Sequence, residues 1–155
     1  MKNGLLMIMG ASFVALAGCT TTAPTTANSG APDVVTTQAI QAFTDVCLKT
    51  APSFKGAAKA AANYGVTSFT ELGESQIGVT ADKSLSIQVK PARECAVTTE
   101  ARPQANPGSA FRNAVAAAAG IAPPAAVPFT ATIGKKEFVF THDRKGGEAY
   151  VMVAR

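Results

Sequence analysis

The sequence contains no tryptophan, a single histidine and few charged residues, and these shortages exclude several classes of function. One histidine, His142, cannot build a histidine-rich metal site. Charged residues make up 15% of the chain, and 14 Lys and Arg against 10 Asp and Glu leave a net charge of +4. Nucleic-acid-binding proteins usually carry a basic face or stripe. The excess of positive charge in this sequence is mild, and its basic residues include two separate turn-like pairs, Lys135–Lys136 and Arg144–Lys145. The sequence therefore indicates no nucleic-acid partner.

Motifs that hold cofactors or activate nucleophiles are also missing. The sequence has no Gly-x-Ser-x-Gly elbow, no phosphate-binding loop and no Gly-x-Gly-x-x-Gly stretch. It has no Cys-x-x-Cys pair, so neither redox catalysis nor a structural zinc site is supported. From the sequence we therefore assign no catalytic residue, no metal ligand and no cofactor.

Two arrangements could still carry acid–base chemistry, and we expect neither to do so. Asp143 follows His142 and could orient it as a general base, but a histidine at a strand end is usually a surface residue. Glu71 and Glu74 could form a carboxylate pair, but two acids beside a glycine-containing turn are usually solvated.

The longest apolar run lies near Met1. Lys2 precedes an apolar stretch from Leu5 to Ala17, which is shorter than the roughly 20 residues that a transmembrane helix needs. The run ends in Leu16-Ala17-Gly18-Cys19. This pattern resembles the signal peptide and lipobox of bacterial lipoproteins. An ordinary secretory peptide would share the charge-then-apolar pattern but would not place a cysteine directly after Leu-Ala-Gly.

The resemblance implies a location and an anchor. It implies that residues 1–18 are a signal peptide, which is cut off before Cys19. The Cys19 sulfur would receive a diacylglycerol, and its new amino group would be acylated, commonly with palmitate. Thr20 follows the cysteine in place of an aspartate, which implies the outer membrane, facing the periplasm. Residues 19–32 would be the lipidated cysteine and a tether of Thr, Ala and Pro, because this uncharged stretch has too little apolar surface to fold.

Two further cysteines, Cys47 and Cys95, form an even pair, which favours a disulfide in an oxidising compartment. In the chain-entropy model such a bridge would contribute roughly 4 kcal/mol. The alternative is two separate buried thiols, since free cysteine packs as a small hydrophobe.

Hydrophobic periodicity predicts three helices in residues 33–155, which we interpret as a single domain. The first runs to about Lys49, with Ile40, Phe43 and Cys47 on one stripe. The second covers about 54–64, with Ser53 as its cap and Phe54, Ala58 and Ala61 facing inward. The third opens at Asn106–Pro107, where proline suits the first helical position. Its inner face is formed by Phe111, Val115 and Ala118 or Ala119.

Alternation with a period of two predicts the strands. The clearest is 84–90, with Leu85, Ile87 and Val89 on one face. The other predicted strands are 77–79, 94–99, 129–133, 137–142 and 149–153, and 66–72 is a further candidate.

The order of elements predicts an α+β fold, an antiparallel sheet of about five to six strands with three helices packed mainly on one face. The other face would carry Ser84, Ser86, Gln88 and Lys90. For function we favour a binding or structural module of the envelope, with membrane lipid as one partner and another envelope protein or a cell-wall component as a second. The alternative is a small periplasmic hydrolase or peptidoglycan-acting enzyme, and the molecular activity stays open.

Overall fold

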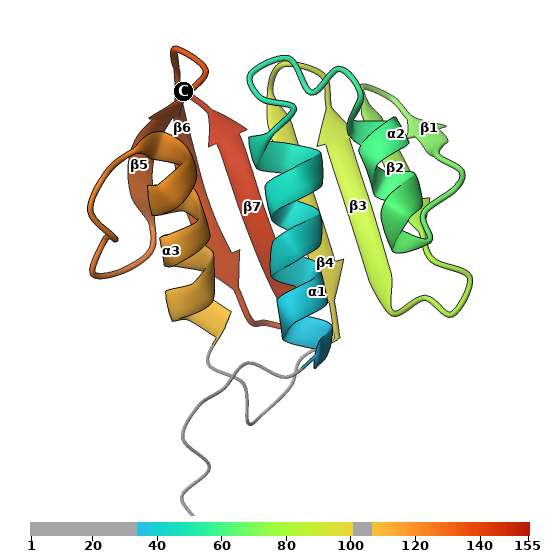
Figure 1. The fold of residues 1–155 in the computed structure, drawn as a ribbon. Helices are drawn as coiled ribbons and strands as arrows, with labels where there is room; N and C mark the ends of the chain where they lie inside the picture. Colours follow the sequence, from blue (N-terminus) through green and yellow to red (C-terminus); the bar gives the residue numbers. More distant parts are fainter. Residues whose placement is uncertain (1–33, 101–106) are drawn as a thin grey trace, which may run out of the picture.

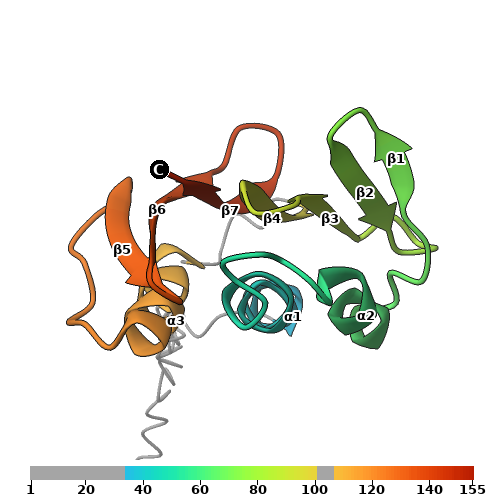
Figure 2. The same cartoon turned by 90° about the horizontal axis from the view of Figure 1, so that it is seen from above.

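The structure is a computed structural model that describes residues 34–100 and 107–155. Within these residues, seven strands form one antiparallel sheet in the order β1-β2-β3-β4-β7-β6-β5. The helices α1, α2 and α3 all lie on one face of the sheet (Figures 1 and 2). The predicted α+β class is confirmed, but the predicted strand count of five to six is wrong. The count reaches seven because a short strand also forms in the further candidate segment 66–72, over its last three residues as β1 (Thr70–Leu72).

The second helix is shorter than the periodicity predicted, whereas the first and third helical segments lie close to their predicted bounds. The helices are α1 (Val34–Ala42), the π-helix η1 (Phe43–Leu48), α2 (Ala57–Ala61), the 3-10 helix η2 (Ala62–Tyr64) and α3 (Pro107–Ala119). The second helix begins late because Phe54 and Gly56 have φ angles of 58° and 88°, which are left-handed and interrupt a right-handed helix. The interruption also changes which residues face inward, since Ala57 and Ala61 are buried and Ala58 is exposed.

The strands lie close to where the alternation predicted them. They are β1 (Thr70–Leu72), β2 (Ser75–Val79), β3 (Leu85–Lys90), β4 (Glu94–Thr99), β5 (Phe129–Ile133), β6 (Lys136–Asp143) and β7 (Glu148–Ala154). A two-residue turn joins β5 to β6, and its residues Gly134 and Lys135 have φ angles of 56° and 68°. Two positive φ angles are what a tight hairpin turn of the mirror-image type requires.

The sheet consists of two similar halves. In the first half, residues 34–100, helices precede strands that end in β4, and in the second half, residues 107–155, α3 precedes strands that end in β7. The final strands β4 and β7 pair at the centre, where Ala96 lies opposite Val151. Figure 1 shows α1 over the first half and α3 over the second.

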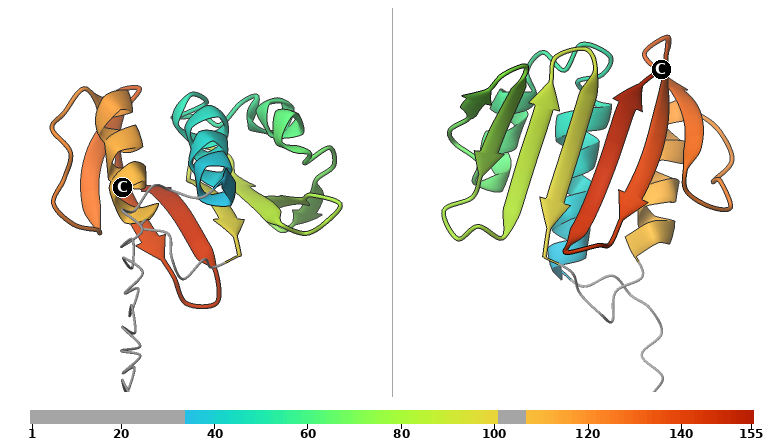
Figure 3. Two further views of the ribbon diagram at one scale, coloured as in Figure 1. Left: turned by 60° about the horizontal axis from the view of Figure 1, so that its bottom comes forward. Right: turned by 180° about the vertical axis from the view of Figure 1, so that it is seen from behind.

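The strand register divides the side chains between the two faces. Leu85, Ile87 and Val89 face the helices and are buried. On the opposite face, Ser86 pairs with Val79 and Gln88 with Ile77. None of the helices in residues 34–100 and 107–155 covers this open face, which the right-hand view of Figure 3 shows from behind. The predicted polar residues of β3 therefore lie on the open face, but two apolar residues of β2 lie beside them.

The core is rich in aromatic rings. Phe111 of α3 lies at the middle of a cluster, with its ring centroid 5.1 Å from that of Phe43 and 5.5 Å from that of Tyr150. Phe129 and Phe140 stack at 5.2 Å beside it. Except for the partly buried Phe129, these rings are fully buried. Seven of the eight phenylalanines lie in the described residues, and all seven are buried in the core or packed against it, where they take the place of tryptophan as large residues.

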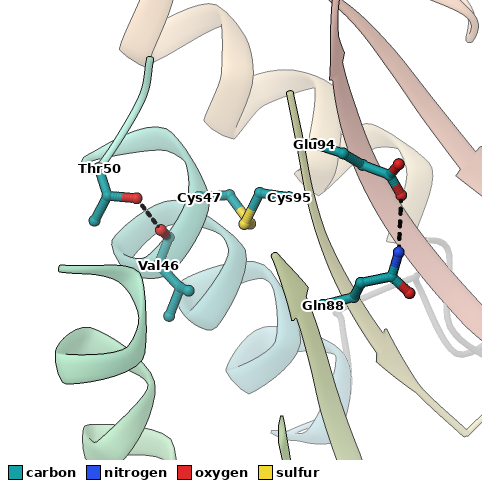
Figure 4. Close-up of a disulfide and its surroundings, with 6 residues drawn as sticks. All are labelled: Val46, Cys47, Thr50, Gln88, Glu94 and Cys95. Carbon is teal, nitrogen blue, oxygen red and sulfur yellow. Dashed lines mark hydrogen bonds between the residues drawn. A yellow bond between two sulfur atoms is a disulfide. The ribbon is translucent and has the colours of Figure 1, made fainter. Parts of the chain in front are cut away.

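A disulfide joins the first helical segment to the sheet. Cys47 of η1 and Cys95 of β4 are bonded, with 5.5 Å between their Cα atoms, and both are fully buried (Figure 4). The sequence predicted this pair because Cys47 and Cys95 form an even pair in a chain expected to be exported to an oxidising compartment. Cys19 lies outside the described residues.

Candidate functional site

A groove between η1 and α3 is the first candidate site. Its volume is about 400 Å³, and its lining residues are Thr44, Leu48, Lys49, Ala114, Ala117, Ala118 and Ile133. The small alanine side chains of α3 leave room that a larger residue would fill. Apart from Thr44 and Lys49 the lining is apolar. Pockets for small ligands commonly have about 300–1,000 Å³ and mostly apolar walls, so the groove is of suitable size and character for a small apolar group.

The π-helical turn η1 shapes one wall of this groove. The backbone amide of Lys49 donates to the carbonyl of Thr44 at 3.0 Å, a spacing of five residues. The Thr44 hydroxyl donates to the carbonyl of Ile40 at 2.8 Å, and the Thr50 hydroxyl donates to that of Val46 (Figure 4). Single π-turns within helices occur frequently at functional sites. Because the Thr44 hydroxyl proton is already bound within the helix, this wall offers a ligand no proton from Thr44.

Lys49 provides the positive charge at the rim of the groove. Its Nζ lies 2.7 Å from Oδ1 of Asp45, and its side chain is 70% exposed. The Tyr64 hydroxyl donates to Oδ2 of the same carboxylate at 2.5 Å. The hydrogen bond from Lys49, followed by that from Tyr64, lowers the pKa of Asp45. Burial, followed by the contact with Asp45, raises the pKa of Tyr64 to about 12.

A buried ionic cluster at the β6–β7 hairpin is the second candidate. Glu148 is fully buried, and its Oε2 lies 2.6 Å from Nε2 of His142. Its Oε1 accepts a hydrogen bond from Nε of Arg144 at 2.8 Å. The His142 ring stacks on Tyr150, with centroids 4.9 Å apart and 12° between the planes. The histidine is therefore oriented by a glutamate from the neighbouring strand.

The expectation that His142 is a surface residue is wrong. Its side chain is only 6% exposed. The reason is its position in β6, since it follows Phe138 and Phe140 at intervals of two and faces the helices as they do. Asp143 faces the other way, and its Oδ1 accepts from the Lys145 amide at 2.9 Å. Phe138 and Phe140 already alternate along β6, and continuing this alternation by two residues would have predicted that His142 faces the core.

This cluster has the parts of a general base, an imidazole held by a carboxylate. A general base must reach the proton that it removes, however, and a ring that is 6% exposed between Phe111 and Tyr150 is shielded from a substrate. We therefore interpret the cluster as structural. A glutamate that is fully buried needs partners for both oxygens, and His142 and Arg144 are those partners.

The structure does not bring Glu71 and Glu74 together into a carboxylate site. Glu71 accepts a hydrogen bond from Gln76 at 2.7 Å, whereas Glu74 pairs with Arg93 at 2.9 Å. Both acids are exposed. They are the solvated pair that the sequence predicted.

Other features of the described residues narrow the possible chemistry. No group of three or more His, Cys, Asp and Glu side chains in residues 34–100 and 107–155 could hold a metal ion. Across the same residues, no helix has both the length and the apolar character needed to cross a membrane. No known protein family, curated protein or solved structure matches the chain significantly.

Proposed function

We propose that this protein is a lipid-anchored envelope protein, held by acylated Cys19 in the outer membrane and facing the periplasm, and that its domain is a binding module. The groove between η1 and α3 is the observation that supports a binding module, because it is a hollow of about 400 Å³ with mainly apolar walls. We infer that it takes a single apolar chain or a group of similar size. The motif Leu16–Cys19 supports the first part of the proposal. The disulfide of Cys47 and Cys95 supports it as well, because disulfides are typical of exported proteins.

The alternative of a periplasmic hydrolase has less support. It would need His142 or Glu71 in an accessible pocket with other polar groups. His142 is buried, and Glu71 lies on the short strand β1 with Gln76 as its partner. Among the described residues that line the groove, in turn, Thr44 and Lys49 are the only polar ones.

Photo-crosslinking tests the groove. A dodecanol analogue with a photoreactive diazirine is added to membranes that contain the full-length protein, and the labelled peptides are mapped by mass spectrometry. We expect label on η1 and on the second half of α3, and competition by unlabelled dodecanol. Ala118→Phe fills the groove and should abolish this label, whereas Ala58→Phe, the same change at an exposed position of α2, should leave it unchanged. Equal labelling of both variants would refute apolar binding in the groove.

Metabolic labelling tests the anchor. Cys19→Ser should incorporate no radioactive palmitate and should accumulate as unprocessed precursor, since the acyl chains are attached at this residue. Stable membrane attachment usually requires two such hydrophobic signals. Cys47→Ser is the control and should incorporate palmitate as the wild type does. Equal label on Cys19→Ser and wild type would refute the proposed anchor.

A further inference from the structure

We propose that the groove selects single-chain anionic amphiphiles, of which a fatty acid carboxylate is the simplest, and that Lys49 contacts the negative head. This inference rests on the proposed function, because it names the ligand class of the same groove. Of the lining residues that the structure describes, Lys49 is the one with a charge, and none is acidic. A ligand with its chain in the groove and an anionic head at the rim would thus match the site in both polarity and charge.

The volume of the groove favours one chain over two. About 400 Å³ lies near the lower end of the usual range for small-ligand pockets, about 300–1,000 Å³. Leu48 and Ile133 provide branched apolar surface, and Ala114, Ala117 and Ala118 provide a low wall along α3. A hollow of this volume suits one unbranched chain better than the two chains of a diacyl lipid.

Lys49 can move from its present partner to a ligand at low cost. Its pair with Asp45 spans one helical turn at the surface, and such exposed pairs contribute little to stability. Asp45 does not lose all its partners when Lys49 leaves, because the Tyr64 hydroxyl stays on the other carboxylate oxygen. The Asp45–Tyr64 hydrogen bond therefore keeps η1 tied to η2 while the lysine exchanges one carboxylate for another.

The test compares photoreactive dodecanoate with the dodecanol analogue on the full-length protein in membranes. Label in the groove is measured relative to label elsewhere in the protein, which corrects for partitioning into the bilayer. We expect dodecanoate to compete at a concentration about two- to fivefold lower than dodecanol, because an exposed ion pair contributes little and Lys49 gives up its pair with Asp45 to form it. Added salt should reduce the difference, because the contact lies at the surface.

Three variants separate the charge of Lys49 from its packing. Lys49→Gln should remove the preference for dodecanoate, which is measured as the ratio of dodecanoate to dodecanol labelling in the same variant. Lys59→Gln, at an exposed position of α2 outside the groove, should leave this ratio at its wild-type value. Asp45→Asn should strengthen dodecanoate binding, because Lys49 then has no competing carboxylate, and it should not change dodecanol binding. Melting temperatures of the three variants show that each is folded.

The outcomes distinguish the two proposals. If neither ligand labels the groove, the proposed function itself fails. If both label it equally, or if Lys49→Gln weakens both to the same extent, apolar binding stands and the anionic preference is refuted. Label that appears in Cys19→Ser but not in the lipidated protein would mean that the chain's own acyl group occupies the groove, and this too would overturn the inference.

Discussion

In residues 34–100 a disulfide of Cys47 and Cys95 attaches the helical layer to the sheet. In residues 107–155 the attachment is a cluster of rings centred on Phe111 of α3, which Phe43 of the first half also joins. The layouts of the two halves are alike, with helical segments before a run of antiparallel strands. A disulfide acts mainly by restricting the unfolded chain, while buried rings stabilise the folded state directly. The same arrangement of helices on strands can thus be stabilised either by restricting the unfolded state or by improving the packing of the folded state.

The comparison extends to the ionic contacts. In the first half, Lys49, Asp45 and Tyr64 form an exposed chain of contacts on the surface of the helices. In the second half, the carboxylate of Glu148 is fully buried between strands. Exposed pairs contribute little and buried pairs are costly to break, so equivalent substitutions should have unequal effects in the two halves.

Phe111→Ala should have the largest effect. Phe111 is fully buried at the centre of the aromatic cluster, and loss of such a ring typically costs roughly 3–5 kcal/mol. Urea unfolding measures the free energy of unfolding. Phe69→Ala, which removes a partly buried ring from the first half, is the control and should cost less. A larger loss for Phe69→Ala would contradict the assignment of the main aromatic cluster to the second half.

Replacing both Cys47 and Cys95 by alanine should cost roughly 2–5 kcal/mol, because it removes a cross-link between residues 48 positions apart. Hydrogen exchange should then increase more in η1 and β4 than in α3 and β6. Reducing the wild type should produce the same pattern. Faster exchange in α3 alone would show that the disulfide does not hold the first half as described.

His142→Ala should destabilise the protein by roughly 1.5–3 kcal/mol, since it removes a hydrogen bond to a buried carboxylate. Thermal and urea unfolding give the measurement. The control is Asp143→Ala, whose exposed side chain caps a turn and should matter less. A change below about 0.5 kcal/mol for His142→Ala, as surface substitutions give, would mean that the histidine is not part of the core.

Tyr64→Phe should have the smallest effect, about 1 kcal/mol at neutral pH for a single hydrogen bond. Folding raises the pKa of Tyr64 from 10.0 to about 12, so its contribution is complete below pH 10 and is lost as the pH rises toward 12. The pKa of Asp45 is lowered from 3.8, so its contribution is present above that pH and is lost as the pH falls below it.

Unfolding curves at several pH values check this. Wild type should lose stability relative to Tyr64→Phe between pH 10 and 12, and the two should run parallel near pH 7 to 9. If the difference between them is the same across the alkaline range, folding does not raise the pKa of Tyr64.

Periodicity in the sequence predicted the local elements well where neighbouring residues decide them. Leu85, Ile87 and Val89 alternate with polar residues, and the strand forms as expected. The second helix was predicted too early, because nothing local to Phe54 showed that its backbone would be left-handed. In β2, Ile77 and Val79 face away from the helices, and Gly78 faces inward. A Cβ atom on Gly78 would lie 2.4 Å from Cγ1 of Val66, so the segment before β1 occupies that side.

By itself the sequence determined the fold class, most strand positions and the two inward-facing cysteines, because 3.6- and two-residue periods depend only on which side of an element is apolar. Tertiary structure alone decided the partner of His142 and the existence of the groove. Glu148 meets His142 through the pairing of β6 with β7, and Ala118 and Leu48 line the same groove because α3 packs beside η1. Both arrangements arise when segments distant in the sequence pack together, and no local pattern specifies which segments these will be.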